Sequence, residues 1–312
     1  MRLEDPDVRI IVHGQQAFGQ SVLEALLDRG DEVIAVYCEP DKEGRPHDPI
    51  KACALERGIP VFQPKSYRNG ETQAEFAGHN ADLCVMAYVT LFVPEDVLNA
   101  PTHGSIQYHP SLLPLHRGGS SINWPIIWGR SETGLSIFWP DNGLDEGPIL
   151  LQKKVAISDD DTLGSLYFDQ LFPMGVAAIL ESVDMVKAGT APKVDQDHSL
   201  ATYEGWCRGH LVRINWHLPT QTTWNLIRGA NPAPGAWTTY DGTNVTIFDS
   251  EKVNVANSVQ PGEVTEISEA GICVATSEGQ IRVKRVRADG GKKVAASVWA
   301  AEVNLTVGKR FK

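Results

Sequence analysis

Short apolar runs alternate with longer amphipathic stretches through the first half of the chain. Strands are predicted where β-branched and apolar residues cluster, at residues 8–12, 33–37, 61–62, 83–87, 104–108, 134–139 and 149–155. Helical spacing predicts helices at residues 20–28, 50–56, 121–128 and 162–187, the last one interrupted at Pro173 and Gly175. Because strands separated by helices usually pair in parallel, we expect a doubly wound, mostly parallel α/β sheet of the Rossmann-like kind.

The pattern changes near Gly189. Residues 189–199 are polar and irregular, which is typical of a linker, and one more helix is predicted at 220–229. Beyond Trp237, short β-rich runs are separated by Gly, Asp and Asn, which favours a small antiparallel β-barrel of the OB-like kind. We therefore expect an α/β domain over residues 1–192, a linker over 193–206 and a C-terminal β-barrel domain over 207–312.

Composition narrows the class of protein. Hydrophobic residues make up 42% and charged residues 21% of the 312 positions, as in ordinary globular proteins. No uninterrupted apolar run approaches the roughly 20 residues that span a bilayer, and the charged first seven residues lack the order of a signal peptide. We expect a cytoplasmic protein without a membrane partner. The five cysteines lie far apart in the sequence, which predicts reduced thiols and no structural metal site (Cys38, Cys53, Cys84, Cys207, Cys273).

Charge is distributed unevenly. The formal net charge of −11 discourages non-specific binding to nucleic acid. The last 31 residues, from Arg282, nevertheless carry nine lysines or arginines against Asp289 and Glu302. We interpret this basic stretch as the exposed face of alternating strands, and the alternative is a local contact with an anion or a nucleic acid.

Candidate chemistry is sought at the carboxyl ends of the strands, because open α/β sheets bind ligands there. The turn from Gly14 to Gly19 lacks the spacing of a dinucleotide fingerprint and of a P-loop. We interpret it as a tight strand-to-helix turn. The alternative is a polar rim in which Gln15 and Gln16 contact a substrate.

Two loops carry stronger signals. His109 directly follows a predicted strand, in a loop stiffened by Pro110 and Pro114. Asp145 lies in an acidic, glycine-rich loop after another predicted strand. If the two loops meet, the carboxylate stabilises the imidazolium form, which suits a base that takes a proton from an attacking amine. Gln107 shares a strand face with His109, and its amide N–H can support a tetrahedral oxyanion.

These loops resemble the signatures of the formyltransferase family built on 10-formyltetrahydrofolate. The motif from His109 to Pro114 with Arg117-Gly118, and the later Asp141-x-Gly143-x-Asp145-x-Gly147, are similar to the family's two ordered motifs. The family includes methionyl-tRNA formyltransferase and the N-terminal hydrolase domain of 10-formyltetrahydrofolate dehydrogenase. The likeness extends over nearly the whole chain and is nearest to that hydrolase domain.

The resemblance implies an assignment of roles. His109 and Asp145 become the catalytic pair, with Gln107 beside them, and 10-formyltetrahydrofolate is the cosubstrate that leaves as tetrahydrofolate, without a metal. The pterin would be lined by two groups of residues (Ala87, Tyr88, Val89, Thr90 and Leu91; Asp141, Asn142, Gly143 and Leu144). Four further residues are expected near the substrate (Gln15, Gln16, Ser111 and Arg117).

The formyl acceptor stays open at this point. The family's transferases place Asn where this chain has Gln107, and the hydrolase domain carries an aliphatic residue there. The acceptor is a small-molecule amine, water or methionyl-tRNA, and we favour the amine. The tRNA reading is weakened because residues 39–45 are short and mixed in charge, where the tRNA enzymes carry a basic loop. A non-enzymatic alternative is an inactive folate- or RNA-binding homologue. The sequence leaves the oligomeric state undetermined.

Overall fold

The computed structural model describes residues 8–253, 255 and 258–312. The charged first seven residues, on which the expectation about a signal peptide rests, lie outside the described residues. The described chain divides into two compact units. The first contains the residues up to Gly118, Gly134–Val155 and Gln170–Tyr203, and the second contains Gly119–Thr133, Ala156–Asp169 and Glu204–Lys312.

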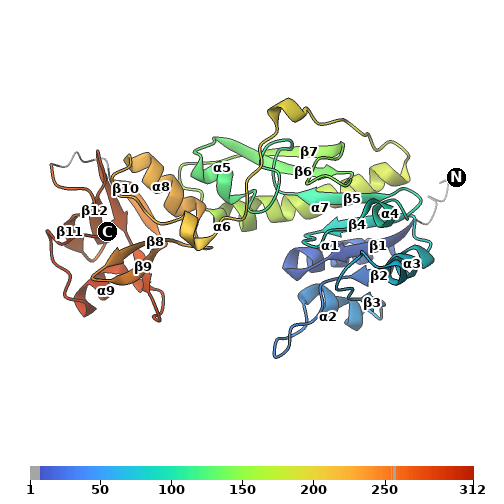
Figure 1. The fold of residues 1–312 in the computed structure, drawn as a ribbon, viewed down its shortest axis with the longest axis horizontal. Helices are drawn as coiled ribbons and strands as arrows, with labels where there is room; N and C mark the ends of the chain where they lie inside the picture. Colours follow the sequence, from blue (N-terminus) through green and yellow to red (C-terminus); the bar gives the residue numbers. More distant parts are fainter. Residues whose placement is uncertain (1–7, 254, 256–257) are drawn as a thin grey trace. The chain divides into compact units, whose positions relative to one another are not determined.

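The first unit is built on a seven-stranded sheet with the order β3-β2-β1-β4-β5-β6-β7 (Figure 1). Its strands are β1 (Arg9–Gly14), β2 (Glu32–Tyr37), β3 (Val61–Phe62), β4 (Leu83–Ala87), β5 (Ser105–His109), β6 (Glu132–Phe138) and β7 (Ile149–Ala156). The first five strands in this order, β3, β2, β1, β4 and β5, are parallel to their neighbours, whereas β6 runs antiparallel to β5. The predicted mostly parallel α/β sheet is confirmed.

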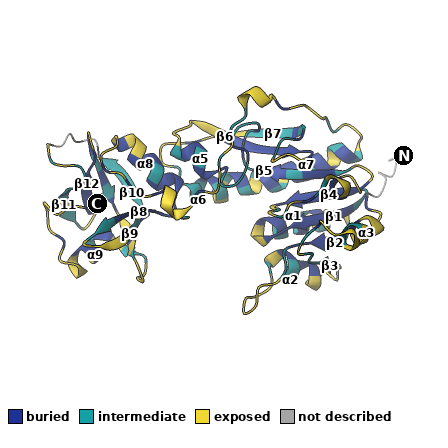
Figure 2. Cartoon of the chain, viewed as in Figure 1, coloured by how far each residue is buried: buried dark blue, intermediate teal, exposed yellow. Residues whose placement is uncertain are grey.

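Helices cover both faces of this sheet. One face carries α1 (Gln16–Asp28), α2 (Pro49–Glu56) and α7 (Phe172–Lys187), whose apolar side chains share a core with Val12, Val85 and Tyr108. The other face carries α3 (Gly70–Gly78) and α4 (Glu95–Leu98), which pack with Ile11, Cys84 and Met86. Strands β1 and β4 are therefore buried on both sides, which explains their nearly continuous apolar sequence (Figure 2).

The predicted helix at 162–187 consists of three consecutive segments. These are α6 (Leu163–Ser165), a π-helical segment (Leu166–Leu171) and α7, which has Pro173 in its first turn. The stretch Leu163–Lys187 is long and apolar enough to cross a membrane, with a mean hydropathy of 1.3 in its most apolar window. Ala178, Ile179 and Val183 are nevertheless buried in the core against the sheet. We therefore describe α7 as a core helix.

The second unit joins segments that are far apart in the sequence. Helix α5 (Asn123–Ile127) packs on α8 (Thr220–Gly229), and the Asn123 side chain donates to the Gly229 carbonyl at 2.8 Å. A Cβ at Gly229 would lie 2.6 Å from the Ile127 side chain, so the two helices approach closely. Residues 119–133 and 156–169 thus pack with the C-terminal strands, although the sequence pattern groups them with the α/β domain.

The C-terminal strands are all antiparallel and form two four-stranded sheets, β10-β13-β12-β11 and β15-β14-β9-β8. Their bounds are β8 (Ala236–Tyr240), β9 (Thr243–Ile247), β10 (Ser250–Val253), β11 (Val264–Ser268), β12 (Gly271–Ala275), β13 (Gln280–Val283), β14 (Arg285–Ala288) and β15 (Val294–Ala295), followed by α9 (Ala296–Glu302). Their inward side chains share a second core with Trp216, Trp224 of α8 and Trp299 of α9. This confirms the predicted antiparallel C-terminal domain.

Candidate active site

The strand order reverses between β1 and β4, which makes their carboxyl ends the expected ligand site of the sheet. Gly14 lies opposite Ala87 in the ladder, and a Cβ at Gly14 would meet the Ala87 carbonyl oxygen at 2.5 Å. The backbone amide of Gln15 donates to the same Ala87 carbonyl at 3.3 Å. Glycine at position 14 therefore lets the β1–α1 turn close onto the end of β4.

His109 is the last residue of β5, one strand further along. The Tyr108 ring packs on Phe18, with centroids 4.4 Å apart, in the core under α1. Because side chains alternate along a strand, Gln107 and His109 project from the opposite face. The His109 side chain is buried, and its Nε2 lies 2.9 Å from the His116 carbonyl oxygen. A carbonyl only accepts, so Nε2 must carry the hydrogen.

The loop after β5 folds back on itself and onto β6. The Ser111 hydroxyl donates to the Leu115 carbonyl at 2.6 Å, and the Ser136 hydroxyl donates to the Ser111 carbonyl at 2.7 Å. The side chain of Ser111 is completely buried. The Ser111 hydroxyl therefore holds the loop, and the expected place of Ser111 near the substrate stays a prediction.

Asp145 reaches the same place from the loop between β6 and β7. Its Oδ2 lies 3.5 Å from His109 Nδ1 and accepts a hydrogen bond from the Gly118 amide at 2.8 Å. Asp145 has a left-handed backbone with φ of 56°. A Cβ at Gly147 would lie 1.8 Å from the Trp139 carbonyl oxygen, so glycine is required for the loop to close. The structure thus brings His109 and Asp145 together, as the sequence analysis expects.

This arrangement leaves Nδ1 as the ring nitrogen that faces the Asp145 carboxylate, because Nε2–H is committed to the His116 carbonyl. The Asp145 side chain is only 10% exposed, so water screens the pair weakly. Gln107, which is partly buried, makes no side-chain hydrogen bond to any residue in the described part of the chain.

The Arg117 side chain is also held within the protein. Its guanidinium is fully buried and donates to the Gln196 side chain, the Tyr203 hydroxyl and His198. The Tyr203 hydroxyl in turn donates to Glu146 at 2.7 Å. A buried guanidinium needs several acceptors, and Arg117 finds them inside the protein, while its expected place near the substrate stays a prediction.

The loop predicted to line the pterin follows β4. Tyr88 is 38% exposed and has a left-handed backbone with φ of 67°, and burial together with Glu39 raises the pKa of its hydroxyl. The side-chain amide of Gln15 donates to the Thr90 hydroxyl at 3.4 Å, and that hydroxyl donates to Glu39. Gln16 is exposed, and its backbone amide donates to Asp48 at 2.7 Å.

The second predicted pterin loop, which includes Asp141–Leu144, is fastened at two points. The Asp141 carboxylate accepts from the Gly143 amide at 2.8 Å. The Asn142 side chain donates to Glu95 of α4 at 2.6 Å, and Leu144 is 57% exposed. Sequence reasoning missed Glu95, Glu39 and Gln196, because isolated polar residues outside a motif give no signal of a long-range contact.

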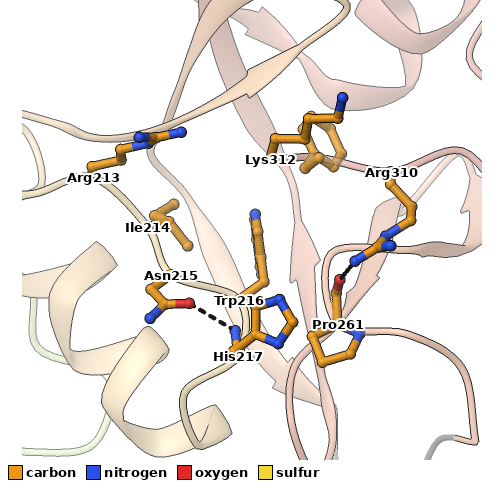
Figure 3. A pocket seen from close by; sticks show the side chains of 9 residues that line it. Arg213, Ile214, Asn215, Trp216, His217, Pro261, Arg310 and Lys312 are labelled. Atoms are coloured by element: carbon orange, nitrogen blue, oxygen red, sulfur yellow. Dashed lines mark hydrogen bonds between the residues drawn. The ribbon is translucent and has the colours of Figure 1, made fainter.

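Two cavities of about 400 Å³ are lined by residues other than this pair. One is in the first unit, and its lining includes Asn99, His103 and Lys193. The other is in the C-terminal unit, and its lining includes Arg213, Trp216, Arg310, Phe311 and Lys312. Figure 3 shows the side chains of Arg213, Trp216, Arg310 and Lys312 around this cavity. Arg310 donates to the Pro261 carbonyl at 2.9 Å, and Arg213 lies over the Trp237 ring. Within residues 8–253, 255 and 258–312, none of these three cations forms an ion pair.

Fold and site define a two-unit α/β protein with a histidine–carboxylate pair at the carboxyl edge of its sheet. Comparison with known proteins gives the family. Residues 8–174 match the family model described as Formyl transferase, and residues 210–304 match that described as Formyl transferase, C-terminal domain. The chain belongs to the formyl transferase family, which confirms the resemblance seen in the sequence.

Individual relatives carry different names. The chain is 39% identical over 305 residues to the human mitochondrial 10-formyltetrahydrofolate dehydrogenase, covering 93% of this chain but only 33% of that protein. It is 36% identical over 308 residues to the methionyl-tRNA formyltransferase of Geobacter metallireducens, covering 97% and 98% of the two chains. Its fold is similar to WlaRD, a sugar 3N-formyl transferase solved in the presence of dTDP and 5-N-formyl-THF, with a TM-score of 0.69, 18% identity and 89% and 97% coverage.

Proposed function

We propose that this protein transfers the formyl group of 10-formyltetrahydrofolate to an amine acceptor. The observation that carries the proposal is the buried contact of 3.5 Å between His109 Nδ1 and Asp145 Oδ2 beside the switch point of the sheet. The names of the dehydrogenase and of the methionyl-tRNA formyltransferase support formyl and folate chemistry, and the ligand named with the sugar formyltransferase structure supports a reduced folate.

In the proposed reaction, the lone pair of the amine attacks the formyl carbon and forms a tetrahedral intermediate. The His109–Asp145 pair takes the proton that the amine nitrogen must lose, with His109 as the base and Asp145 as its partner. The Gln107 amide donates to the oxyanion. Collapse breaks the bond to N10 of the folate, and the same proton returns to N10, giving tetrahydrofolate and a formylated amine.

We propose that the pterin lies along the main chain of residues 87–91 and 141–144. Parallel sheets bind ligands outside the carboxyl ends of their strands, and the first loop begins at that edge, directly after β4. The second loop follows β6, which is antiparallel to β5, but its Asn142 bonds to Glu95 of α4, and Asp145 of the same loop meets His109 at the end of β5. Gln15 follows β1 at the same edge, where its side chain lies 3.4 Å from Thr90. This placement would bring the folate's formyl group toward β5 and His109.

Purified protein mixed with formyl-labelled 10-formyltetrahydrofolate tests the proposal. We expect little release of tetrahydrofolate without an acceptor and formylation when primary amines, including aminosugar nucleotides, are supplied. Formate released at the full rate without any amine would instead support a hydrolase. Tetrahydrofolate binding without turnover in any mixture would contradict both and support an inactive binding homologue.

Methionyl-tRNA is a second candidate acceptor. The basic pocket around Arg213, Arg310 and Lys312 supports it, because unpaired cations bind phosphates, and so does the relative of that name. Replacing Arg310 and Lys312 by Gln should then raise KM for methionyl-tRNA without affecting small amines. An unchanged KM in that variant would remove this candidate.

A further inference from the structure

Gln196 connects the loop that contains Asp145 to the buried side chain of Arg117. Its side chain is 6% exposed, and its Nε2 donates to the carbonyls of Asp145 and Gly147 at 2.9 and 2.7 Å. Its Oε1 accepts from Arg117 Nε and Nη2 at 3.2 and 2.7 Å. A primary amide has two N–H donors and two lone pairs, and all four are used here. The orientation of the amide is therefore fixed by its partners.

The backbone explains how a residue from the predicted linker reaches this loop. Val194 and Ile149 form an antiparallel bridge with reciprocal hydrogen bonds of 2.8 and 3.0 Å. Counting two residues from each side places Gln196 opposite Gly147. The amide side chain therefore spans the chain on both sides of Asp145, because it bonds to Asp145 itself and to the residue two positions later.

The other side of the Gln196 amide leads back to His109. Its partner Arg117 lies between two residues that touch the pair: the His116 carbonyl accepts from His109 Nε2 at 2.9 Å, and the Gly118 amide donates to Asp145 Oδ2 at 2.8 Å. Holding Arg117 therefore holds the short stretch of backbone on which both members of the pair rest.

We propose that Gln196 is a positioning residue that sets Asp145 against His109 by tying the Asp145 backbone to the Arg117 side chain. The proposal rests on the function proposed above, in which the pair takes up a proton. The loop needs an external tie because Asp145 is held in a left-handed conformation that costs energy outside glycine. The Gln196 side chain supplies this tie, because its two N–H groups donate to the carbonyls of Asp145 and Gly147.

Gln196→Glu is the sharpest test, because it keeps the size and the acceptor for Arg117 but replaces the N–H donors by an oxygen that repels the two carbonyls. We expect kcat to fall about 100-fold, the effect of a displacement of roughly 1 Å, while KM for the folate changes less than about 3-fold. Gln196→Met, which lacks donors and acceptors, should behave similarly. Gln63→Glu is the matched control, since Gln63 also bridges a carbonyl, that of Glu39, and a cation, Lys51, but lies outside the pair.

A double-mutant cycle separates positioning from general damage. In an Asp145→Asn background, Gln196→Glu should lower kcat no further, because the interaction that Gln196 positions is already lost. A second loss of about 100-fold in that background would overturn the proposal.

An NMR measurement that does not depend on turnover distinguishes the positioning role of Gln196 from the proposed formyl transfer. The nitrogen NMR signals of the His109 ring in Gln196→Glu or Gln196→Met should move in the same direction as in Asp145→Asn. Unchanged His109 signals in these variants overturn the positioning role whether or not the protein turns over. Inactivity of the unaltered protein, with the shifts present, contradicts only the proposed function.

Discussion

The amide of Gly118 and the ring of His109 share one carboxylate oxygen of Asp145, at 2.8 and 3.5 Å. A backbone amide cannot rotate as a side chain does, so this bond fixes the oxygen that faces the imidazole. The pair is thereby oriented by the main chain of the neighbouring loop, as the proposed proton transfer would require.

Asp145→Asn keeps the shape of the side chain and removes its charge. We expect kcat to fall by about 10²–10⁴-fold, the usual contribution of a positioned acid–base group. The kcat of His109→Ala should fall by about the same factor. Binding of tetrahydrofolate, followed by calorimetry, should persist in both variants. Activity near that of the unaltered protein in either one would show that the assigned roles are wrong.

Gln107 tests the oxyanion role, because its side-chain amide has no hydrogen-bond partner among the described residues. Gln107→Leu should lower kcat by about 10²–10³-fold, the cost of removing one oxyanion donor. Gln107→Asn keeps the amide and should retain or improve transfer in the same steady-state assay. If Gln107→Leu leaves the rate unchanged, Gln107 has no part in the chemistry.

Gly14 tests the close approach at the switch point. In Gly14→Ala the added Cβ would lie 2.5 Å from the Ala87 carbonyl oxygen, and neither backbone can move freely. We expect urea unfolding to show a loss of about 1–3 kcal/mol, as for other overpacked sites. Gly78→Ala at the end of α3 meets nothing within 4 Å and serves as the control, with stability equal or slightly higher. Equal stability of the two variants would contradict this account of the turn.

His13 makes the free energy of unfolding depend on pH. Burial lowers its pKa from 6.5 to about 3, and its Nε2 lies 3.3 Å from the Tyr67 hydroxyl. Between these two values the unfolded chain binds a proton that the folded protein refuses, so stability falls as pH falls through 6.5 and levels off near 3. Between pH 7 and pH 4.5 this group accounts for a loss of roughly 2–3 kcal/mol.

His13→Gln keeps a hydrogen-bond acceptor for Tyr67 and does not titrate. The free energy of unfolding, measured in urea at pH 7 and pH 4.5, should therefore change less in this variant than in the unaltered protein. Equal changes in the two proteins would mean that His13 is protonated in the folded state.

The sequence by itself determined the strands, because strands buried on both faces, such as β1 and β4, are short continuous apolar runs that can be recognised locally. It also marked His109, at the end of a strand that leads into a proline-rich loop, and Asp145, in an acidic, glycine-rich loop that follows another strand. The antiparallel C-terminal strands left a similar record in their regular turns.

Tertiary structure decided the rest. Gln196 lies in a polar stretch that reads as a linker, yet it is buried and bonds to the Asp145 loop. Arg117 was expected near the substrate and has a fully buried guanidinium, and α5 packs with α8 of the C-terminal unit. These features depend on hydrogen bonds and contacts between residues far apart in the chain, whose partners have no fixed spacing. A periodic pattern records only which face of an element is buried, and it contains nothing about the distant group that meets a single polar side chain.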